Sequence, residues 1–147
     1  MAVKMEELYF DKPKEDLYIV DITREVRESI RDSRINDGIA NIFVGCTTAS
    51  ICTMKYDPEH INMVKKLLEF VAPSKADYMH HKSCGDYYGN GGDTNGKSHM
   101  RSALFGPSIN VPFKSQKLLL DKYDSIVLMD FDIIKRKRKV IVQMVGK

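Results

Sequence analysis

The chain has 147 residues, of which 43% are hydrophobic, and carries a formal net charge of +3 at pH 7. This composition suits one domain, residues 1–147, with a core large enough to fold unaided, and no apolar run approaches the roughly 20 residues that a membrane span needs. Three cysteines without a Cys-x-x-Cys pair indicate neither a disulfide framework nor a zinc ribbon, and the N-terminus lacks a secretory pattern, so we expect a cytoplasmic protein with no membrane partner.

The first segments of the chain predict two strands followed by a helix. Residues 6–10 and 16–22 alternate between apolar and polar side chains, and a turn-forming cluster separates them. Thr23 is the expected N-cap of an amphipathic helix that runs to about Ser33, where Asn-Asp-Gly supplies a stop. We therefore expect an opening pair of strands packed near one helix.

Two core strands and a second helix come next. Residues 39–44 and 50–54 are rich in apolar and β-compatible side chains. Asp57 is the expected N-cap of the helix, with Pro58 at its first position and Ala72-Pro73 at its end. Its buried stripe is expected to consist of Ile61, Val64, Leu67, Leu68 and Val71.

The C-terminal half predicts a short helix and four strands. Asn95 is the expected cap of a helix through Phe105, which Gly106-Pro107 ends. The strands are expected at residues 108–113, 117–120, 125–132 and 139–145. Strands and helices do not alternate as in a doubly wound fold, so the predicted class is α+β with a mostly antiparallel sheet.

A glycine-rich polar loop at residues 85–96 is the first candidate for a site. His80 and His81 precede it and His99 follows it. Glycine lets the backbone approach a ligand closely, and such loops inside compact domains usually have a use. The alternative is a plain surface connection with solvated histidines beside it.

Neutral imidazole and thiolate are ligands that suit a borderline-soft cation such as zinc. His80, His99 and Cys46 therefore form a candidate set of three ligands, with an open fourth position. Alternatively, Cys46 is a small core side chain and each histidine is an ordinary polar residue. Three aspartates on loops or element ends are candidate oxygen ligands or general bases: Asp57, Asp86 and Asp93.

Residues 91–98, Gly-Gly-Asp-Thr-Asn-Gly-Lys-Ser, match the spacing of a phosphate-binding P-loop. A true P-loop follows a buried strand, whereas a polar glycine-rich stretch precedes this one, so nucleoside triphosphate hydrolysis is not expected. Anion binding near Lys97 by another geometry remains open.

The run of five basic residues at 135–139 has two interpretations. It can neutralise nucleic-acid phosphates, or it can form a solvated hairpin between two strands. No aromatic side chains are interleaved for base stacking, so we expect the hairpin and no nucleic-acid partner.

Several motifs together follow the order and spacing of one known family along nearly the whole chain. They are Cys46-Thr47-Thr48-Ala49-Ser50, the Asp57 helix ending in Ala72-Pro73, Tyr78-x-His80, Asp93-x-Asn95-x-x-x-His99, Gly106-Pro107-Ser108, and the tail from Phe131-Asp132 to Gly146. The chain in this respect resembles the YjbQ-like family, some members of which are described as secondary thiamine-phosphate synthases. Those enzymes join a pyrimidine diphosphate to a thiazole phosphate with loss of pyrophosphate.

The resemblance implies a small α+β fold with a β-sandwich-like sheet and about three helices, assembled as a homotrimer with a polar cleft near the subunit contact. His80 and His99 match the motif histidines, and Cys46 stands where the family usually has another histidine. The polar positions that match the family and are expected to bind the ligand are Thr47, Thr48, Ser50, Asp93 and Asn95.

These observations lead to a hypothesis of a metal-assisted enzyme that acts on a phosphate-bearing small molecule, possibly as a thiamine-phosphate synthase. The candidate catalytic residues are His80, His99, Asp57 and Lys97. A divalent cation, zinc or magnesium, would be held by Cys46, His80 and His99. The rival hypothesis is a non-catalytic trimeric protein that binds a metal or a small ligand at a degenerate site.

Overall fold

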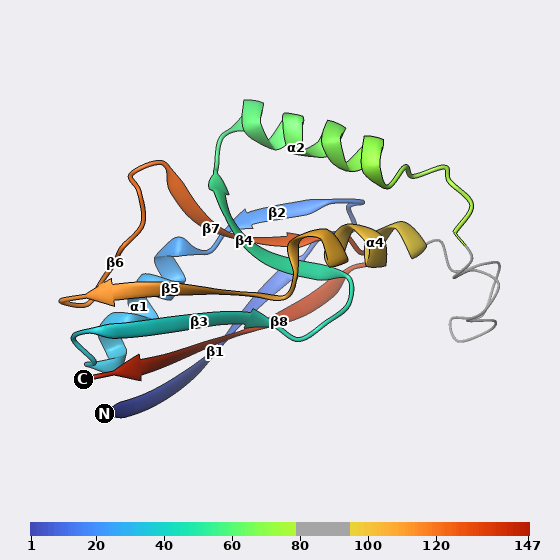
Figure 1. Ribbon diagram of the computed structural model, residues 1–147. Coiled ribbons are helices and arrows are strands. Elements are labelled where there is room, and N and C mark those ends of the chain that lie inside the picture. The colour runs from blue at the N-terminus through green and yellow to red at the C-terminus, as the bar shows by residue number, and fades with distance from the viewer. Residues whose placement is uncertain (79–94) are drawn as a thin grey trace.

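The structure, a computed structural model, describes residues 1–78 and 95–147 (Figure 1). In these ranges the helices are α1 (Thr23–Ser33), α2 (Pro58–Val71) and α4 (Gly96–Phe105). The strands are β1 (Ala2–Lys12), β2 (Tyr18–Asp21), β3 (Gly38–Val44), β4 (Ala49–Lys55), β5 (Ser108–Lys114), β6 (Lys117–Leu118), β7 (Asp124–Asp130) and β8 (Arg136–Gly146).

The strands form two sheets in which every neighbouring pair is antiparallel. The larger sheet has the order β1-β8-β3-β5-β6 and the smaller one has the order β2-β7-β4. This arrangement is the predicted α+β class. The two opening strands do not pair with each other, because β1 joins the larger sheet and β2 the smaller one. β3 and β4 are divided in the same way, so both connections cross between the sheets.

The main hydrophobic core lies between the two sheets. Side chains of a strand alternate between its two faces, and one face of each sheet is apolar and points inward. Ile42 of β3, Leu128 of β7 and Val142 of β8 are each fully buried in this layer. Val26 and Ile30 of α1 join the same cluster, so α1 completes the core at the end of the sandwich where both chain termini lie (Figure 1).

A second apolar cluster covers the outer face of the smaller sheet. Leu68 of α2 and Phe105 of α4 pack there with Met129 and Phe131, and the Phe105 and Phe131 rings stack with centroids 6.1 Å apart. The smaller sheet is therefore the middle of three layers. None of the helices among the described residues is long and apolar enough to cross a bilayer.

Helix α2 begins and ends as predicted, but its buried stripe is narrower than predicted. Asp57 is the N-cap, and its Oδ1 accepts a hydrogen bond from the His60 backbone N–H at 2.9 Å. Leu68 is buried, whereas Leu67 and Val71 are about half exposed. The buried stripe is narrow because only one side of α2 packs on the smaller sheet, and the neighbouring helical positions face away from it.

The N-cap prediction for α1 is wrong. The helix covers the predicted range, but Thr23 is its first residue, and Ile22 occupies the cap position without a side-chain cap. The Thr23 hydroxyl is used elsewhere, because it donates to Asp21 Oδ1 at 2.6 Å and accepts from the Ile126 backbone N–H at 2.8 Å. Tertiary contact with β7 therefore decides the role of this side chain.

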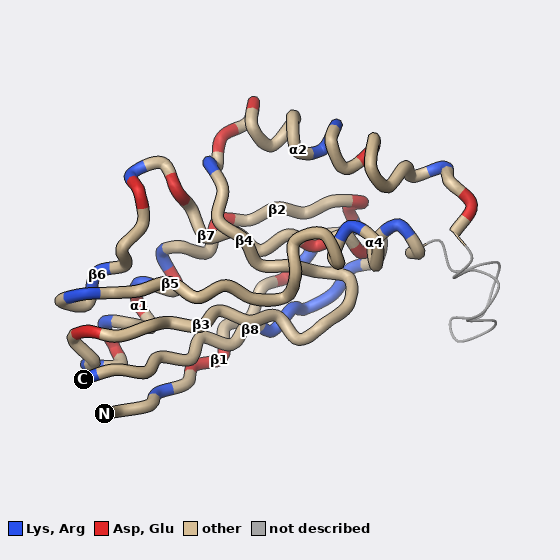
Figure 2. The backbone as a smooth tube through the Cα atoms, viewed as in Figure 1, with Lys and Arg blue, Asp and Glu red and all other residues tan. Residues whose placement is uncertain are grey.

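The basic run at residues 135–139 is not a solvated hairpin. Strand β8 begins at Arg136, so most of the run lies inside the larger sheet, where Figure 2 shows it as a blue stretch. The alternation of a strand sends Arg138 inward and Lys139 outward. Arg138 is 7% exposed, whereas Lys139 makes an exposed ion pair with Glu7 at 3.0 Å.

Candidate functional site

Four segments meet at the end of the sandwich that lies away from the chain termini. They are the end of β1, the β3–β4 turn, the β7–β8 turn and the start of α4 (Figure 1). The Phe131 backbone N–H donates to Thr48 O at 2.9 Å, which joins the two turns. The Ser98 hydroxyl donates to Phe131 O at 2.5 Å, which adds α4. We call this region the polar end.

The polar end contains a buried ion network around Arg138. The guanidinium donates from Nε and Nη2 to Asp130, which is fully buried. Nη2 also donates to the Thr48 hydroxyl at 2.9 Å and lies 3.4 Å from Asp132 Oδ2. The Thr48 hydroxyl in turn donates to the same Asp132 oxygen at 3.3 Å. One arginine therefore connects β7, the β7–β8 turn and the β3–β4 turn.

The charged form of Arg138 is favoured despite its burial. Removal of the guanidinium from water opposes ionisation, but the hydrogen bonds and charge of Asp130 outweigh this effect and raise the pKa of Arg138. Asp130 also accepts a hydrogen bond from the Asp132 backbone N–H at 2.9 Å, which shapes the β7–β8 turn. The hydrogen bond within the β7–β8 turn thus orients the Asp130 carboxylate, which also binds Arg138.

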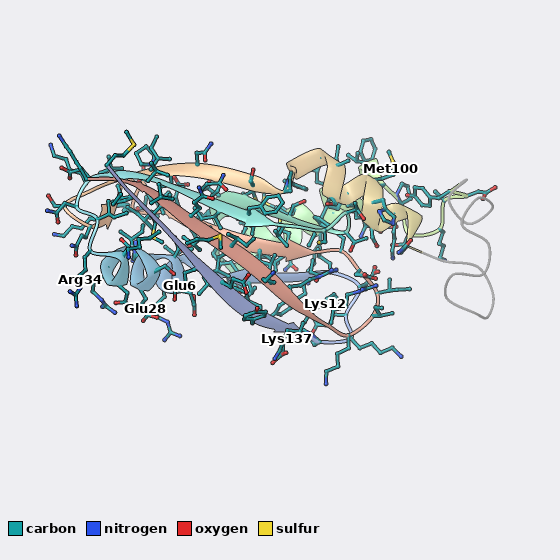
Figure 3. All side chains as sticks on the ribbon, turned by 90° about the horizontal axis from the view of Figure 1, so that it is seen from below. Glu6, Lys12, Glu28, Arg34, Met100 and Lys137 are labelled. Carbon is teal, nitrogen blue, oxygen red and sulfur yellow. The ribbon has the colours of Figure 1, made fainter. Side chains whose placement is uncertain are left out.

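Lys12 is a second buried cation at the polar end. It is 1% exposed, and its ammonium group donates to Pro13 O at 2.9 Å and Glu15 O at 2.6 Å. Burial lowers the pKa of Lys12, the charges of Asp130 and Asp132 oppose this change, and Arg138 adds to it. Figure 3 shows Lys12 at the same end of the paired strands as Lys137.

Helix α4 carries two cations that fasten neighbouring segments to the polar end. Lys97 Nζ lies 2.5 Å from Asp16 Oδ1 and donates to Ser74 Oγ at 3.3 Å. Arg101, one turn later, donates to Ala72 O from two nitrogens at 2.9 and 3.1 Å. The end of α2 and the β1–β2 loop are therefore both tied to the first turns of α4.

The threonine-rich turn divides into exposed and buried positions. Thr47 is exposed, Thr48 is buried in the ion network, and Ser50 is fully buried. The Ser50 hydroxyl donates to Ser102 O at 2.9 Å, and the Ser102 hydroxyl donates to Ala49 O at 2.9 Å. Ser50 thus fastens α4 to β4, and Thr47 is the residue of this turn that faces solvent.

Only some of the other predicted site residues lie at the polar end. Asn95, Lys97 and His99 lie at the start of α4, and Cys46 is a half-buried thiol on the β3–β4 turn. His80 and Asp93, like His81, Cys84 and Asp86, lie outside the described residues. Within the described ranges, no group of three His, Cys, Asp or Glu side chains is arranged to hold a metal ion.

Asp57 lies far from the polar end. It is at the start of α2, whereas Arg101 contacts the end of that helix, and a helix of 14 residues is about 21 Å long. Its pKa is lowered by the hydrogen bond from the His60 backbone N–H and by Lys55, which lies 3.0 Å away. The structure therefore gives Asp57 a helix-capping position.

Sequence reasoning named none of the buried charged residues of the polar end as site residues: Lys12, Asp130, Asp132 and Arg138. A usable signal was present in β8, because Arg138, Val140 and Val142 share one strand face and the two valines are core residues. The same periodicity places Asp130 at the inner end of β7. Asp130 and Arg138 are eight positions apart, but the expected hairpin kept them from being read as partners, and Lys12 comes from the other end of the chain.

Comparison with known proteins decides the family of this fold and site. The family model described as "UPF0047 protein YjbQ-like" matches residues 6–147. The chain belongs to this YjbQ-like family. A UPF0047 protein of Methanothermobacter thermautotrophicus is 30% identical over 129 residues, covering 88% of this chain and 83% of that protein. One of Methanocaldococcus jannaschii is 29% identical over 147 residues, covering 99% and 98%.

Solved structures of this YjbQ-like family show the same fold. A crystal structure from Sulfolobus solfataricus, described as a YbjQ-like protein of unknown function, has a TM-score of 0.89 at 21% identity and covers 99% of both chains. A yjbq/upf0047 family protein from Clostridium acetobutylicum has a TM-score of 0.82 at 28% identity, covering 95% of this chain and 99% of that one. The α+β architecture of this YjbQ-like chain is thus shared over nearly its whole length.

The ion network predicts a large effect of removing Arg138. We expect Arg138→Met to lower the free energy of unfolding by about 3–5 kcal/mol, because Asp130 is left as an unpaired buried charge. The double variant Arg138→Met with Asp130→Asn should recover part of this loss. Lys137→Gln, an exposed neighbour, should change stability by less than about 0.5 kcal/mol. Urea unfolding measures all four proteins, and equal stability of Arg138→Met and native protein would contradict the prediction.

The lowered pKa of Lys12 predicts a pH dependence of stability. Between this pKa and the ordinary value of 10.5, the unfolded chain binds more protons than the folded one, so folding stability rises with pH. Above pH 10.5 the free-energy cost of burying the charged ammonium is absent, and below the folded pKa of Lys12 this cost is fully present. Urea unfolding from neutral pH toward 10.5 should show this rise in native protein relative to Lys12→Met. A constant difference between the two proteins across this range would refute it.

Proposed function

We propose that the polar end is the active site of a metal-assisted enzyme that acts on a phosphate-bearing small molecule. The observation that carries this proposal is the convergence of the threonine-rich turn, the β7–β8 turn and the start of α4 around buried cations. Thiamine-phosphate synthesis is the specific reaction suggested by the YjbQ-like resemblance. It forms a carbon–nitrogen bond between a pyrimidine and a thiazole phosphate and releases pyrophosphate.

The start of α4 supports an anionic substrate. A helix N-terminus attracts anions through its backbone N–H groups and dipole, and α4 begins at Gly96. Lys97 adds a cation that is 9% exposed, and its partner Asp16 is about half exposed. In the proposed complex, a phosphate oxygen takes the place of the Asp16 carboxylate on Lys97, and the departing pyrophosphate keeps this contact.

A divalent cation would be held by Cys46 and His99, with His80 as the third ligand. The donor types fit zinc. Cys46 lies two residues before Thr48 and His99 follows Ser98, and Thr48 and Ser98 both form hydrogen bonds with Phe131. When bound, such an ion supplies Lewis-acid stabilisation of phosphate oxygens. In the proposed reaction the residues of the chain orient the substrate, and His99 transfers a proton.

The proposal predicts that Lys97 and His99 are each needed for turnover. Purified protein with a divalent metal, the pyrimidine diphosphate and the thiazole phosphate should form thiamine phosphate. Lys97→Gln should lower kcat/KM by about a hundredfold or more, because a charge that stabilises the leaving group is lost. His99→Ala should also lower it strongly. Lys75→Gln, an exposed lysine nearby, is the matched control and should retain native activity.

Two results of this assay would count against the enzyme proposal. Equal product from native protein and His99→Ala would remove the histidine from the mechanism. No product from any of the proteins would remove thiamine-phosphate synthesis, and tight metal retention without turnover would instead identify a metal-binding protein.

We also propose that the chain assembles as a homotrimer through the outer face of α2. Four large apolar side chains on this helix are exposed: Met63, Leu67, Phe70 and Val71. Leu67 is four residues after Met63, and Phe70 and Val71 are three and four residues after Leu67, so the four side chains form one stripe on the helix surface. Phe70 is 85% exposed, and a contiguous apolar surface of this kind marks a protein contact.

The trimer proposal predicts the effect of a charge on this stripe. Native protein should have three times the 16.8 kDa mass of the chain by light scattering after size exclusion. Phe70→Asp should give the monomer mass, because burying an unpaired carboxylate is costly. Asn62→Asp, exposed on α2 but outside the stripe, should remain trimeric. A monomeric native protein, or a trimeric Phe70→Asp variant, would overturn the proposal.

A further inference from the structure

Two cations lie one turn apart on the buried side of α4, and each is paired with a carboxylate from another element. The Lys97 side chain is 9% exposed and lies 2.5 Å from Asp16 Oδ1, whereas the Asp16 side chain is 52% exposed. The Arg101 side chain is 3% exposed and lies 2.9 Å from Glu69 Oε2, whereas the Glu69 side chain is 53% exposed. In both pairs the cation is buried and the carboxylate lies on the solvent side.

The two carboxylates differ in how firmly they are held. Glu69 accepts hydrogen bonds from the Ser74 backbone N–H and from the Ser74 hydroxyl, each at 2.8 Å, in addition to the contact with Arg101. Asp16 is paired with Lys97 alone among residues 1–78 and 95–147. An ion pair whose carboxylate is half exposed and makes no other contact contributes little to stability, so Asp16 is the carboxylate that exchanges readily.

The backbone on both sides of Asp16 is anchored, so the carboxylate can leave Lys97 without opening the β1–β2 loop. The Lys12 ammonium donates to Pro13 O at 2.9 Å and to Glu15 O at 2.6 Å, which holds the loop before Asp16. Leu17, the next residue, packs on the second apolar cluster. The exchange therefore needs the rotation of one exposed side chain and not the movement of a segment.

The position of Asp16 shows that an oxyanion on the solvent side can reach Lys97. The ammonium group of Lys97 also donates to Ser74 Oγ at 3.3 Å, and Arg101 Nη2 donates to the same oxygen at 3.5 Å, so two cations lie around one hydroxyl. A phosphate group carries more negative charge than a carboxylate and offers more acceptor oxygens, and both increase its attraction to a buried ammonium. A ligand phosphate is therefore an anion that can replace Asp16 on Lys97.

We propose that Asp16 is an internal competitor for the phosphate group of the ligand and occupies the anion site at Lys97 until a phosphate displaces it. This inference rests on the proposed phosphate-bearing substrate and concerns the regulation of that same site. Because the competitor belongs to the chain, it lowers the apparent affinity for every anion by the fraction of time that it occupies Lys97. Singly charged carboxylates offer Lys97 no more than Asp16 already does, so they are kept out.

The test is an NMR titration of isotope-labelled, full-length protein with inorganic phosphate at constant ionic strength and mildly alkaline pH, where phosphate is mostly a dianion. In native protein the backbone amides at the start of α4 and the side-chain carboxyl resonance of Asp16 should shift together and saturate at the same phosphate concentration. Asp16→Asn should lower the dissociation constant for phosphate about fivefold or more, because the competing charge is gone. Acetate should bind native protein more weakly than phosphate.

Two further variants separate competition from a general change of charge. Lys97→Gln should weaken phosphate binding about tenfold or more, because the cation of the site is lost. Asp11→Asn removes the same negative charge from an exposed position of β1, opposite Lys137 on the outer face of the larger sheet. It should change the phosphate affinity by less than about twofold, because exposed charges at a distance are screened.

Three results would overturn the inference: phosphate affinity of Asp16→Asn no higher than that of native protein, an Asp16 carboxyl resonance that stays in place while phosphate shifts the α4 amides, or acetate that binds native protein as tightly as phosphate. The second and third need no variant, so they decide the question even if Asp16→Asn does not fold.

The outcomes also separate this inference from the proposed function. Phosphate binding that depends on Lys97 but not on Asp16 removes only the competitor. No phosphate binding by native protein or by Asp16→Asn removes the anion site at Lys97, and the inference falls with it. Tighter phosphate binding by Asp16→Asn without thiamine-phosphate synthesis leaves the competitor standing and removes only the proposed reaction.

Discussion

The ion pair between Arg138 and Asp130 is the constraint on which the polar end depends. It joins the start of β8 to the end of β7, which belong to different sheets, and the Thr48 hydroxyl extends it to the β3–β4 turn. A buried pair of this kind does not by itself make a fold more stable than an apolar pair would. What the pair provides here is a defined geometry, because removing either side chain would leave the other as an unpaired buried charge.

The two ends of the sandwich are built from different chemistry. At one end α1 completes an apolar core with Val26 and Ile30, and the chain termini lie beside it. At the other end the space between the sheets is closed by charges and hydroxyls, and α4 is fastened there through Ser98. The apolar core between the sheets thus positions the polar end, where candidate binding residues are held on short turns.

Patterns along the chain predicted the elements well where local chemistry controls them. Helix α2 begins at its Asp57 cap and Pro58, as predicted, and Gly106 follows α4 with a positive φ of 78°, which glycine adopts readily. Prediction failed where partners come from elsewhere. Thr23 was predicted to cap α1 but instead contacts β7. Arg138 was predicted to lie in a solvated hairpin but is buried in the interior.

The sequence by itself determined the α+β class, the limits of most helices and strands, and the family, because periodicity, caps and motif order are properties of neighbouring residues. Only the tertiary structure decided which charges meet. Arg138 and Thr48 are 90 positions apart, and Lys12 faces Arg136 from the other end of the chain. Such pairs depend on strand order and register, and antiparallel pairing between distant segments leaves no local trace in the residues that it brings together.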